Sequence, residues 1–118
     1  MDDDDSIHQV WRGKFAPFKK ENISVIHFKK ADELIAWCEQ QKLLPESSLH
    51  STLFLVDYEL VGSETNGLET LISLGLQKQG ILVTSRYEEP SVQIRCAQHS
   101  IRLIPKAMAG FVPVSTTI

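Results

Sequence analysis

Acidic, hydroxyl and basic residues stand where the apolar stretches of this sequence end. Asp57 follows the run "LFLV", Thr84 ends "GILVT", and Lys106 follows "IRLIP". A run of acids, Asp2 to Asp5, stands near the start. Phosphoryl transfer to an aspartate requires a carboxylate nucleophile, further carboxylates for Mg²⁺, and a hydroxyl and an ammonium group that take up charge on the phosphoryl oxygens. The sequence therefore predicts such a site, with Asp57 as the nucleophile.

The spacing of apolar residues alternates along the chain between helical and strand-like. Helical spacing predicts helices at 7–18, 34–44, 68–74 and 90–99. Apolar or β-branched stretches predict strands at 23–28, 52–56, 80–85 and 101–106. Strands separated by single helices indicate right-handed crossovers and a parallel sheet with helices on both faces, an α/β fold. The carboxyl ends of the strands then meet at one edge of the sheet, where ligands bind in such folds.

Local signals predict where some of these helices begin and end. Asp5 or Ser6 is available as the N-cap of the first helix, and Pro90 suits the first turn of the last one. Gly75 suits the position after a helix end, where the chain often adopts a positive φ. The histidines show no metal-ligand spacing, and we expect His8 on the polar face of the first helix.

The composition is that of an ordinary globular protein. Of the 118 residues, 42% are hydrophobic and 23% charged, so we expect one domain, residues 1–118, with neither disorder nor a membrane span. The net charge of −3 provides no basic field, which argues against nucleic-acid binding. Cys38 and Cys96 form no CxxC pattern, and we expect two buried free thiols in a reducing compartment, the cytoplasm.

The set of strand-end residues resembles the receiver domain of two-component response regulators, a flavodoxin-like doubly wound fold. The likeness covers nearly the whole chain. It makes Asp57 the phosphoacceptor, Thr84 the hydroxyl residue of the fourth strand and Lys106 the lysine of the fifth. Asp2 and Asp3 match the metal-binding acid pair, and the opening "DDDDSIHQVW" resembles the start of receivers fused to hybrid sensor histidine kinases.

The resemblance implies a phosphorelay function. The domain would accept a phosphoryl group from the phosphohistidine of a histidine kinase or of a histidine phosphotransfer domain. It would then hydrolyse its own acyl phosphate, without turnover of an external substrate. The expected cofactor is Mg²⁺, and its expected ligands are Asp2, Asp3, Asp57 and the main-chain carbonyl of Glu59. We expect no contact of this domain with nucleic acid or membrane, and a homodimer is compatible with the family.

Three further residues are expected to modulate the site. In receivers, the residues two positions beyond the aspartate and the threonine flank the path of water to the acyl phosphate. Here they are Glu59 and Arg86, which carry opposite charges, and Ser85 lies between Thr84 and Arg86. A charge-assisted pair across this opening would alter the lifetime of the phosphoryl group.

Four features depart from the receiver pattern. Only Met1 precedes the acid run, which predicts a truncated first strand. Pro105 stands before Lys106 rather than after it, and Leu103 occupies the position of the usual aromatic switch residue. The stretch after Lys106 contains a glycine and Pro113, which predicts a short or missing fifth helix.

The apolar residues Met108, Phe111 and Val112 therefore have no long helix to bury them. We expect this tail to pack over the sheet edge or to contact a neighbouring domain or subunit.

Two other functions remain open at this point. A degenerate receiver would have lost phosphorylation and would act only as a protein-interaction module. A haloacid dehalogenase-type phosphohydrolase also uses an aspartate nucleophile, a hydroxyl residue and a lysine. In that family an aspartate usually stands two residues after the nucleophile, where this chain has Glu59.

Overall fold

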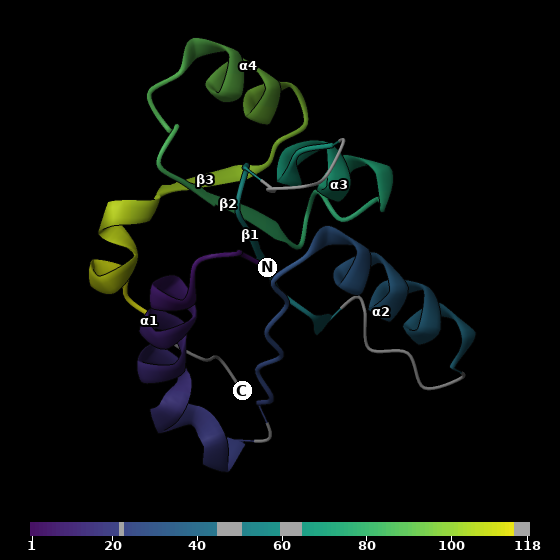
Figure 1. The fold of residues 1–118 in the computed structure, drawn as a ribbon, viewed down its shortest axis with the longest axis vertical. Helices are drawn as coiled ribbons and strands as arrows, with labels where there is room; N and C mark the ends of the chain where they lie inside the picture. Colours follow the sequence, from purple (N-terminus) through teal and green to yellow (C-terminus); the bar gives the residue numbers. More distant parts are fainter. Residues whose placement is uncertain (22, 45–50, 60–64, 115–118) are drawn as a thin grey trace.

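Helices and strands alternate along the chain (Figure 1). The computed structural model describes residues 1–21, 23–44, 51–59 and 65–114, without the side chains of 19–21. The elements run in the order α1 (Asp5–Phe15), the 3-10 helix η1 (Ala16–Glu21), α2 (Ala31–Leu43), β1 (Phe54–Val56), α3 (Gly67–Ser73), β2 (Gly80–Thr84), α4 (Pro90–Gln98), β3 (Arg102–Pro105) and the 3-10 helix η3 (Lys106–Phe111). The predicted α/β class is confirmed.

In the described part of the chain, β1, β2 and β3 form one parallel sheet in that order. Phe54 pairs with Gly80 at the start of β2, and Thr84 at its end pairs with Pro105 of β3. All residues of β2 are buried, because this strand has a partner on each side and helices pack on both of its faces. The carboxyl ends of the three strands lie at one edge, as predicted.

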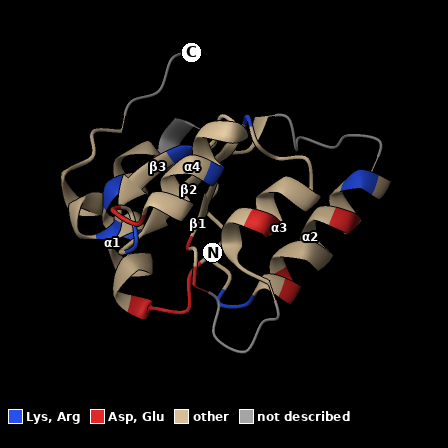
Figure 2. Cartoon of the chain, turned by 90° about the horizontal axis from the view of Figure 1, so that it is seen from above, with Lys and Arg blue, Asp and Glu red and all other residues tan. Residues whose placement is uncertain are grey.

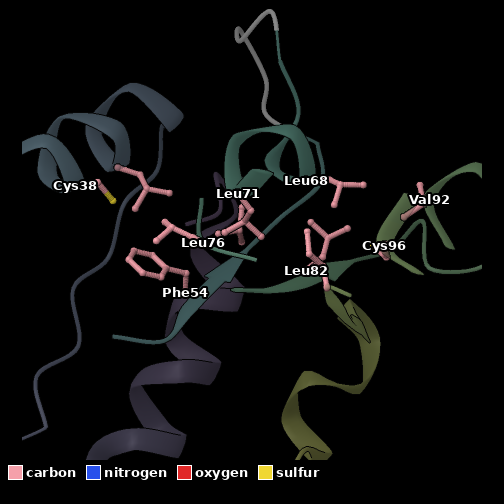
Figure 3. Close-up of a cluster of buried hydrophobic side chains, with 11 residues drawn as sticks. Cys38, Phe54, Leu68, Leu71, Leu76, Leu82, Val92 and Cys96 are labelled. Carbon is pink, nitrogen blue, oxygen red and sulfur yellow. The ribbon is translucent and has the colours of Figure 1, made fainter. Parts of the chain in front are cut away.

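Helices cover both faces of the sheet. Successive side chains of a strand point to opposite faces. Leu82 accordingly joins one buried cluster with residues of α2, α3 and α4, whereas Ile81 and Val83 join a second cluster with α1. Figure 3 shows the first cluster, in which side chains from the three helices converge on β1 and β2. Trp11 of α1, 7% exposed, belongs to the second.

The predicted strand at 23–28 is wrong. These residues lie outside any strand, and Figure 1 shows them as a plain trace leading into α2. Val25 and Ile26 are 42% and 53% exposed. Their β-branched side chains favour a strand, but a strand also needs neighbours that take up its main-chain hydrogen bonds. The hydrogen bond from Asp2 N to Phe28 O, at 3.0 Å, is the only such neighbour contact described for this stretch.

The first helix also differs from the prediction. Its N-cap is Asp4, whose carboxylate accepts a hydrogen bond from the Ser6 amide at 2.9 Å, rather than Asp5 or Ser6. It ends at Phe15, because Pro17 has no N–H to continue an α-helical ladder, and a 3-10 helix follows. The two other local predictions are confirmed, since Gly75 has a φ of 71° and Pro90 opens α4.

After β3 the described chain forms a 3-10 helix and no α-helix. Ala109 is buried in the cluster with α1, and Lys14 Nζ donates a hydrogen bond to Val112 O at 2.5 Å. Met108 and Phe111 remain 49% and 79% exposed. The tail thus packs on α1, while its contact with a neighbouring domain or subunit stays a prediction.

Two sequence-level expectations about the core and the membrane can also be checked. Cys38 and Cys96 are free and buried, as predicted. Within the described residues, no helix combines the length and the apolar character that crossing a membrane requires.

Candidate acidic site at the sheet edge

The main chain of Met1 and Asp2 places the acid run beside the end of β1. The Met1 nitrogen donates to Leu55 O, and Asp57 N donates to Met1 O at 2.9 Å. This pair of hydrogen bonds is the pattern of a parallel bridge opposite Val56. On its other side, Asp2 N donates to Phe28 O. Met1 and Asp2 therefore form a short stub between β1 and the stretch 23–28, and the stub delivers the acids to the carboxyl edge of the sheet.

Three carboxylates meet at this edge. One ligand atom each from Asp2, Asp3 and Asp57 lies within 4.8 Å of the others, which is close enough for a single metal ion. Asp2 and Asp57 are only 4% and 5% exposed, whereas Asp3 is exposed. Figure 2 shows the acidic segment that leads into α1 next to the N-terminus. An all-carboxylate set of oxygen ligands suits Mg²⁺ or Ca²⁺.

Lys106 joins the two buried carboxylates. Its Nζ lies 3.0 Å from Asp2 Oδ2 and 3.5 Å from Asp57 Oδ2, with Asp4 Oδ2 further away at 3.8 Å. The lysine reaches them from the residue after β3, across the full width of the sheet. Sequence reasoning placed these residues at one edge, and the structure brings Asp2, Asp3, Asp57 and Lys106 together there.

The site carries more negative charge than its lysine can balance. Burial raises the pKa of Asp57, and the nearby charge of Asp2 raises it further, although Lys106 opposes both effects. Burial alone would lower the pKa of Lys106, but its hydrogen bond to Asp2 and the charge of Asp57 raise it overall. Two buried carboxylates and a third beside them face one ammonium group, so a bound cation would relieve the repulsion.

Thr84 is positioned next to this group by strand pairing. It is fully buried at 0% exposure, and it pairs with Pro105, directly before Lys106. Its Oγ1 accepts a hydrogen bond from the Arg86 amide at 3.1 Å, which fixes the start of the turn after β2. A contact between Thr84 and Asp57 is not among the described interactions, and its role at a phosphoryl group stays a prediction.

Two of the predicted modulating residues, Glu59 and Arg86, form an ion pair. The Arg86 guanidinium pairs with the Glu59 carboxylate, lies 3.8 Å from Glu89 and stands 5.8 Å from the centroid of the Tyr58 ring. The carboxylate of Glu59 is therefore engaged away from the acid cluster, and only its carbonyl remains as the predicted metal ligand. Ser85 is exposed.

Sequence reasoning missed Gly67 as a structural requirement of the site. Its amide donates to Tyr58 O at 2.9 Å, and a Cβ at this position would lie 1.7 Å from the carbonyl oxygen of Asp57. Only glycine lets α3 begin this close to the end of β1. The neighbouring helix cap, Asn66, whose side chain accepts from Glu69 N at 2.8 Å, was the available signal.

The prediction that His8 lies on the polar face of the first helix is also wrong. His8 is 3% exposed, and it contacts the Asp2 carbonyl and the ring of His27. Burial lowers the pKa of His27, and the neighbouring side chains of His8 and Arg12 lower it further, which favours the neutral form of His27. The available signal was its helical spacing, because His8 stands three and seven positions before Trp11 and Phe15. Its polar partners, by contrast, both lie outside α1.

No protein-family model, curated protein or solved structure matches this chain. The geometry of the acidic site is therefore the basis for assigning a function.

Proposed function

We propose that this chain is a phosphoacceptor receiver domain of a two-component phosphorelay, of the type fused to hybrid sensor histidine kinases. The observation that carries the proposal is Lys106, which bridges the buried carboxylates of Asp2 and Asp57 at the carboxyl edge of a parallel sheet. An ion pair serving stability alone would not need a third carboxylate within metal-binding distance. The finer fold follows from the same proposal, namely a flavodoxin-like doubly wound sheet in which Met1 and Asp2 lie beside β1 and a 3-10 helix follows β3.

The reaction follows from the placement of these groups. A carboxylate oxygen of Asp57 attacks the phosphorus of a phosphohistidine, the N–P bond breaks, and the imidazole leaves with its electron pair and takes up a proton. Lys106, already beside Asp57, then faces the phosphoryl oxygens and stabilises their charge. The Thr84 hydroxyl would donate to another of these oxygens. Mg²⁺ bound by Asp2, Asp3, Asp57 and the Glu59 carbonyl would supply further neutralising charge.

The acyl phosphate is then lost by hydrolysis. Water attacks the phosphorus, the bond to the Asp57 oxygen breaks, and inorganic phosphate and the free carboxylate result. The partner in the forward step is a histidine kinase or a histidine phosphotransfer domain, and the compartment is the cytoplasm. The buried free thiols of Cys38 and Cys96 are compatible with a reducing environment.

The experiment is phosphorylation by a small donor. The chain is incubated with acetyl phosphate and Mg²⁺, and its intact mass is measured. We expect one added phosphoryl group in the wild type and in Asp32→Asn, a matched loss of one exposed carboxylate in the first turn of α2. We expect none in Asp57→Asn. A folded wild-type chain that binds Mg²⁺ but gains no phosphoryl group would instead support the interaction-module alternative.

A further inference from the structure

His8 is buried beside the acidic site without contributing a ligand atom to the described cluster. Its Nε2 lies 2.6 Å from the main-chain oxygen of Asp2, and its Nδ1 lies 2.8 Å from Nδ1 of His27. The two rings meet edge to face, with centroids 4.8 Å apart. One imidazole of α1 thus connects the acid run to the stretch 23–28.

With both imidazole rings neutral, these contacts fix where the protons lie. A carbonyl oxygen only accepts hydrogen bonds, so Nε2 of His8 carries a proton and donates it to Asp2 O. A neutral imidazole has one N–H, which leaves Nδ1 of His8 as an acceptor. Nδ1 of His27 must then carry a proton and donate it to His8. The result is a directed chain of hydrogen bonds from His27 through His8 to the main chain of Asp2.

We propose that His8 is a positioning residue of the acidic site, that it orients the peptide joining Asp2 to Asp3, and that His27 fixes the tautomer in which it does so. This inference rests on the proposed function, because it assigns the two histidines a role in metal binding at the same site.

The peptide between Asp2 and Asp3 is the part of the site that no other described side chain holds. Lys106 and the Asp4 amide fix the carboxylate of Asp2, and the hydrogen bond to Phe28 O fixes its amide. The carbonyl of Asp2 is held by His8. Rotation of this peptide would swing the exposed Asp3 away from Asp57 while leaving Asp2 in place. Outer-shell partners of metal ligands commonly contribute about 10–100-fold to metal affinity, and we expect an effect in that range.

The binding experiment compares Mg²⁺ affinity in variants of the full chain, measured by calorimetric titration. His8→Phe keeps a ring of similar shape and removes both nitrogens, and we expect its affinity to fall at least about tenfold. His8→Gln retains an N–H donor and should recover part of that loss. Val92→Ala is the matched control, since it opens a cavity in the other buried cluster and should lower stability without changing Mg²⁺ affinity.

The spectroscopic experiment tests the hydrogen-bond chain without any metal. Long-range ¹H–¹⁵N correlation spectra of the wild type should show His8 as the Nε2–H tautomer and His27 protonated at Nδ1. In His27→Phe, His8 loses the donor at its Nδ1, and we expect a mixture of tautomers together with a smaller loss of Mg²⁺ affinity than in His8→Phe.

The outcomes separate this inference from the proposed function. A folded His8→Phe protein with wild-type Mg²⁺ affinity, or a wild-type His8 found as the Nδ1–H tautomer, overturns the positioning role. If His8→Phe does not fold, His8→Gln and the wild-type spectrum decide. A wild type that binds Mg²⁺ but accepts no phosphoryl group overturns the phosphoacceptor function alone. A wild type that binds no Mg²⁺ overturns the metal role of His8, even if the tautomers are as expected.

Discussion

Two stretches of similar composition take different structures in this protein. "GILVT" at 80–84 forms β2, buried along its whole length, whereas "ISVIHF" at 23–28 forms no strand and exposes Val25 and Ile26. The difference lies in their neighbours, because β2 has β1 on one side and β3 on the other. Among the described residues, the main chain of the stretch 23–28 is hydrogen-bonded only to the short stub of Met1 and Asp2. Main-chain pairing, more than side-chain propensity, therefore decides which apolar stretch becomes a strand.

The acidic site lies where these two regions meet. Asp57 and Lys106 come from the paired strands, whereas Asp2 comes from the stub that contacts the unpaired stretch. The rigid half of the site is thus set by the sheet, and the other half depends on the few contacts around Asp2. The following predictions test this division, from the largest expected effect to the smallest.

Truncating one residue in each stretch should give the largest contrast. Replacement of Leu82, 0% exposed in β2, by alanine should lower the free energy of unfolding by about 2–5 kcal/mol. Replacement of Ile26, 53% exposed, by alanine should change the free energy of unfolding by no more than about 0.5 kcal/mol. Urea unfolding followed by circular dichroism measures both. Equal losses would mean that the stretch 23–28 is as tightly packed in solution as β2.

A second contrast uses two glycines. Gly67→Ala places a Cβ 1.7 Å from the Asp57 carbonyl, and neither backbone can move without disturbing the end of β1. We expect a loss of about 1–3 kcal/mol, together with weaker Mg²⁺ binding because Asp57 shifts. Gly13→Ala in α1 meets nothing within 4 Å and should stabilise the chain by up to about 1 kcal/mol. Unchanged stability and Mg²⁺ affinity in Gly67→Ala would show that α3 can shift to accommodate the added Cβ without displacing Asp57.

The contrast between paired and unpaired regions also explains what the sequence could predict. Local features sufficed for Gly75, Pro90 and the end of β1, and they placed the ends of β2 and β3 within one residue, because turn chemistry and apolar runs identify them. Since parallel strands end at one edge, Asp57 and Lys106 could be placed together without a structure. In the structure, Lys106 Nζ lies 3.5 Å from Asp57 Oδ2.

The remaining differences depend on distant contacts. Whether 23–28 forms a strand depends on which strands lie beside it, and no pattern within the stretch indicates its neighbours. The burial of His8 depends on the Asp2 carbonyl and on His27, both outside its helix. The choice of Asp4 as N-cap within a run of acids is a matter of one residue's φ and ψ, which composition does not determine.

The pH dependence of stability should report on the junction of the two regions. The pKa of Asp57 is raised in the folded protein, so the folded state holds this proton more tightly than the unfolded state does. Its contribution to stability is therefore present below the usual carboxyl range and is lost as the pH rises through the folded pKa. Without metal, Asp57→Asn should be more stable than the wild type near pH 7.

Asp4, Asp5 and Glu69 have lowered pKa values and give the opposite slope, so the comparison must be between variants. The difference in unfolding free energy between Asp57→Asn and the wild type should grow from about pH 4 to pH 7. Millimolar Mg²⁺ should reverse its sign by stabilising the wild type alone. A difference that is independent of pH would show that the pKa of Asp57 is not raised in the folded protein.

The smallest expected effect concerns two exposed ion pairs, one in each region. Arg86 and Glu59 connect the segments that follow β2 and β1, with side chains 44% and 50% exposed. Lys29, the residue directly after the unpaired stretch, pairs with Asp5 of α1 at 2.7 Å, with side chains 59% and 70% exposed. Exposed pairs contribute about 0–1 kcal/mol, so none of these substitutions should change stability much. Because about 1.4 kcal/mol corresponds to a tenfold change in rate, a pair that spans the path of water could still alter dephosphorylation several-fold.

We expect Glu59→Ala and Arg86→Ala each to change the dephosphorylation rate of the acetyl phosphate-labelled protein several-fold. The change in rate in the double variant should differ from the product of the two single changes. Arg86→Ala should have the larger effect, because the guanidinium also contacts Glu89 and the Tyr58 ring. Lys29→Ala, which breaks an ion pair at the other side of the acid run, should leave the rate unchanged. Intact mass followed over time measures all four variants. Effects that simply multiply in the double variant would show that Glu59 and Arg86 act independently, and an equal change in Lys29→Ala would show that the rate responds to charge near the site rather than to a pair closing its opening.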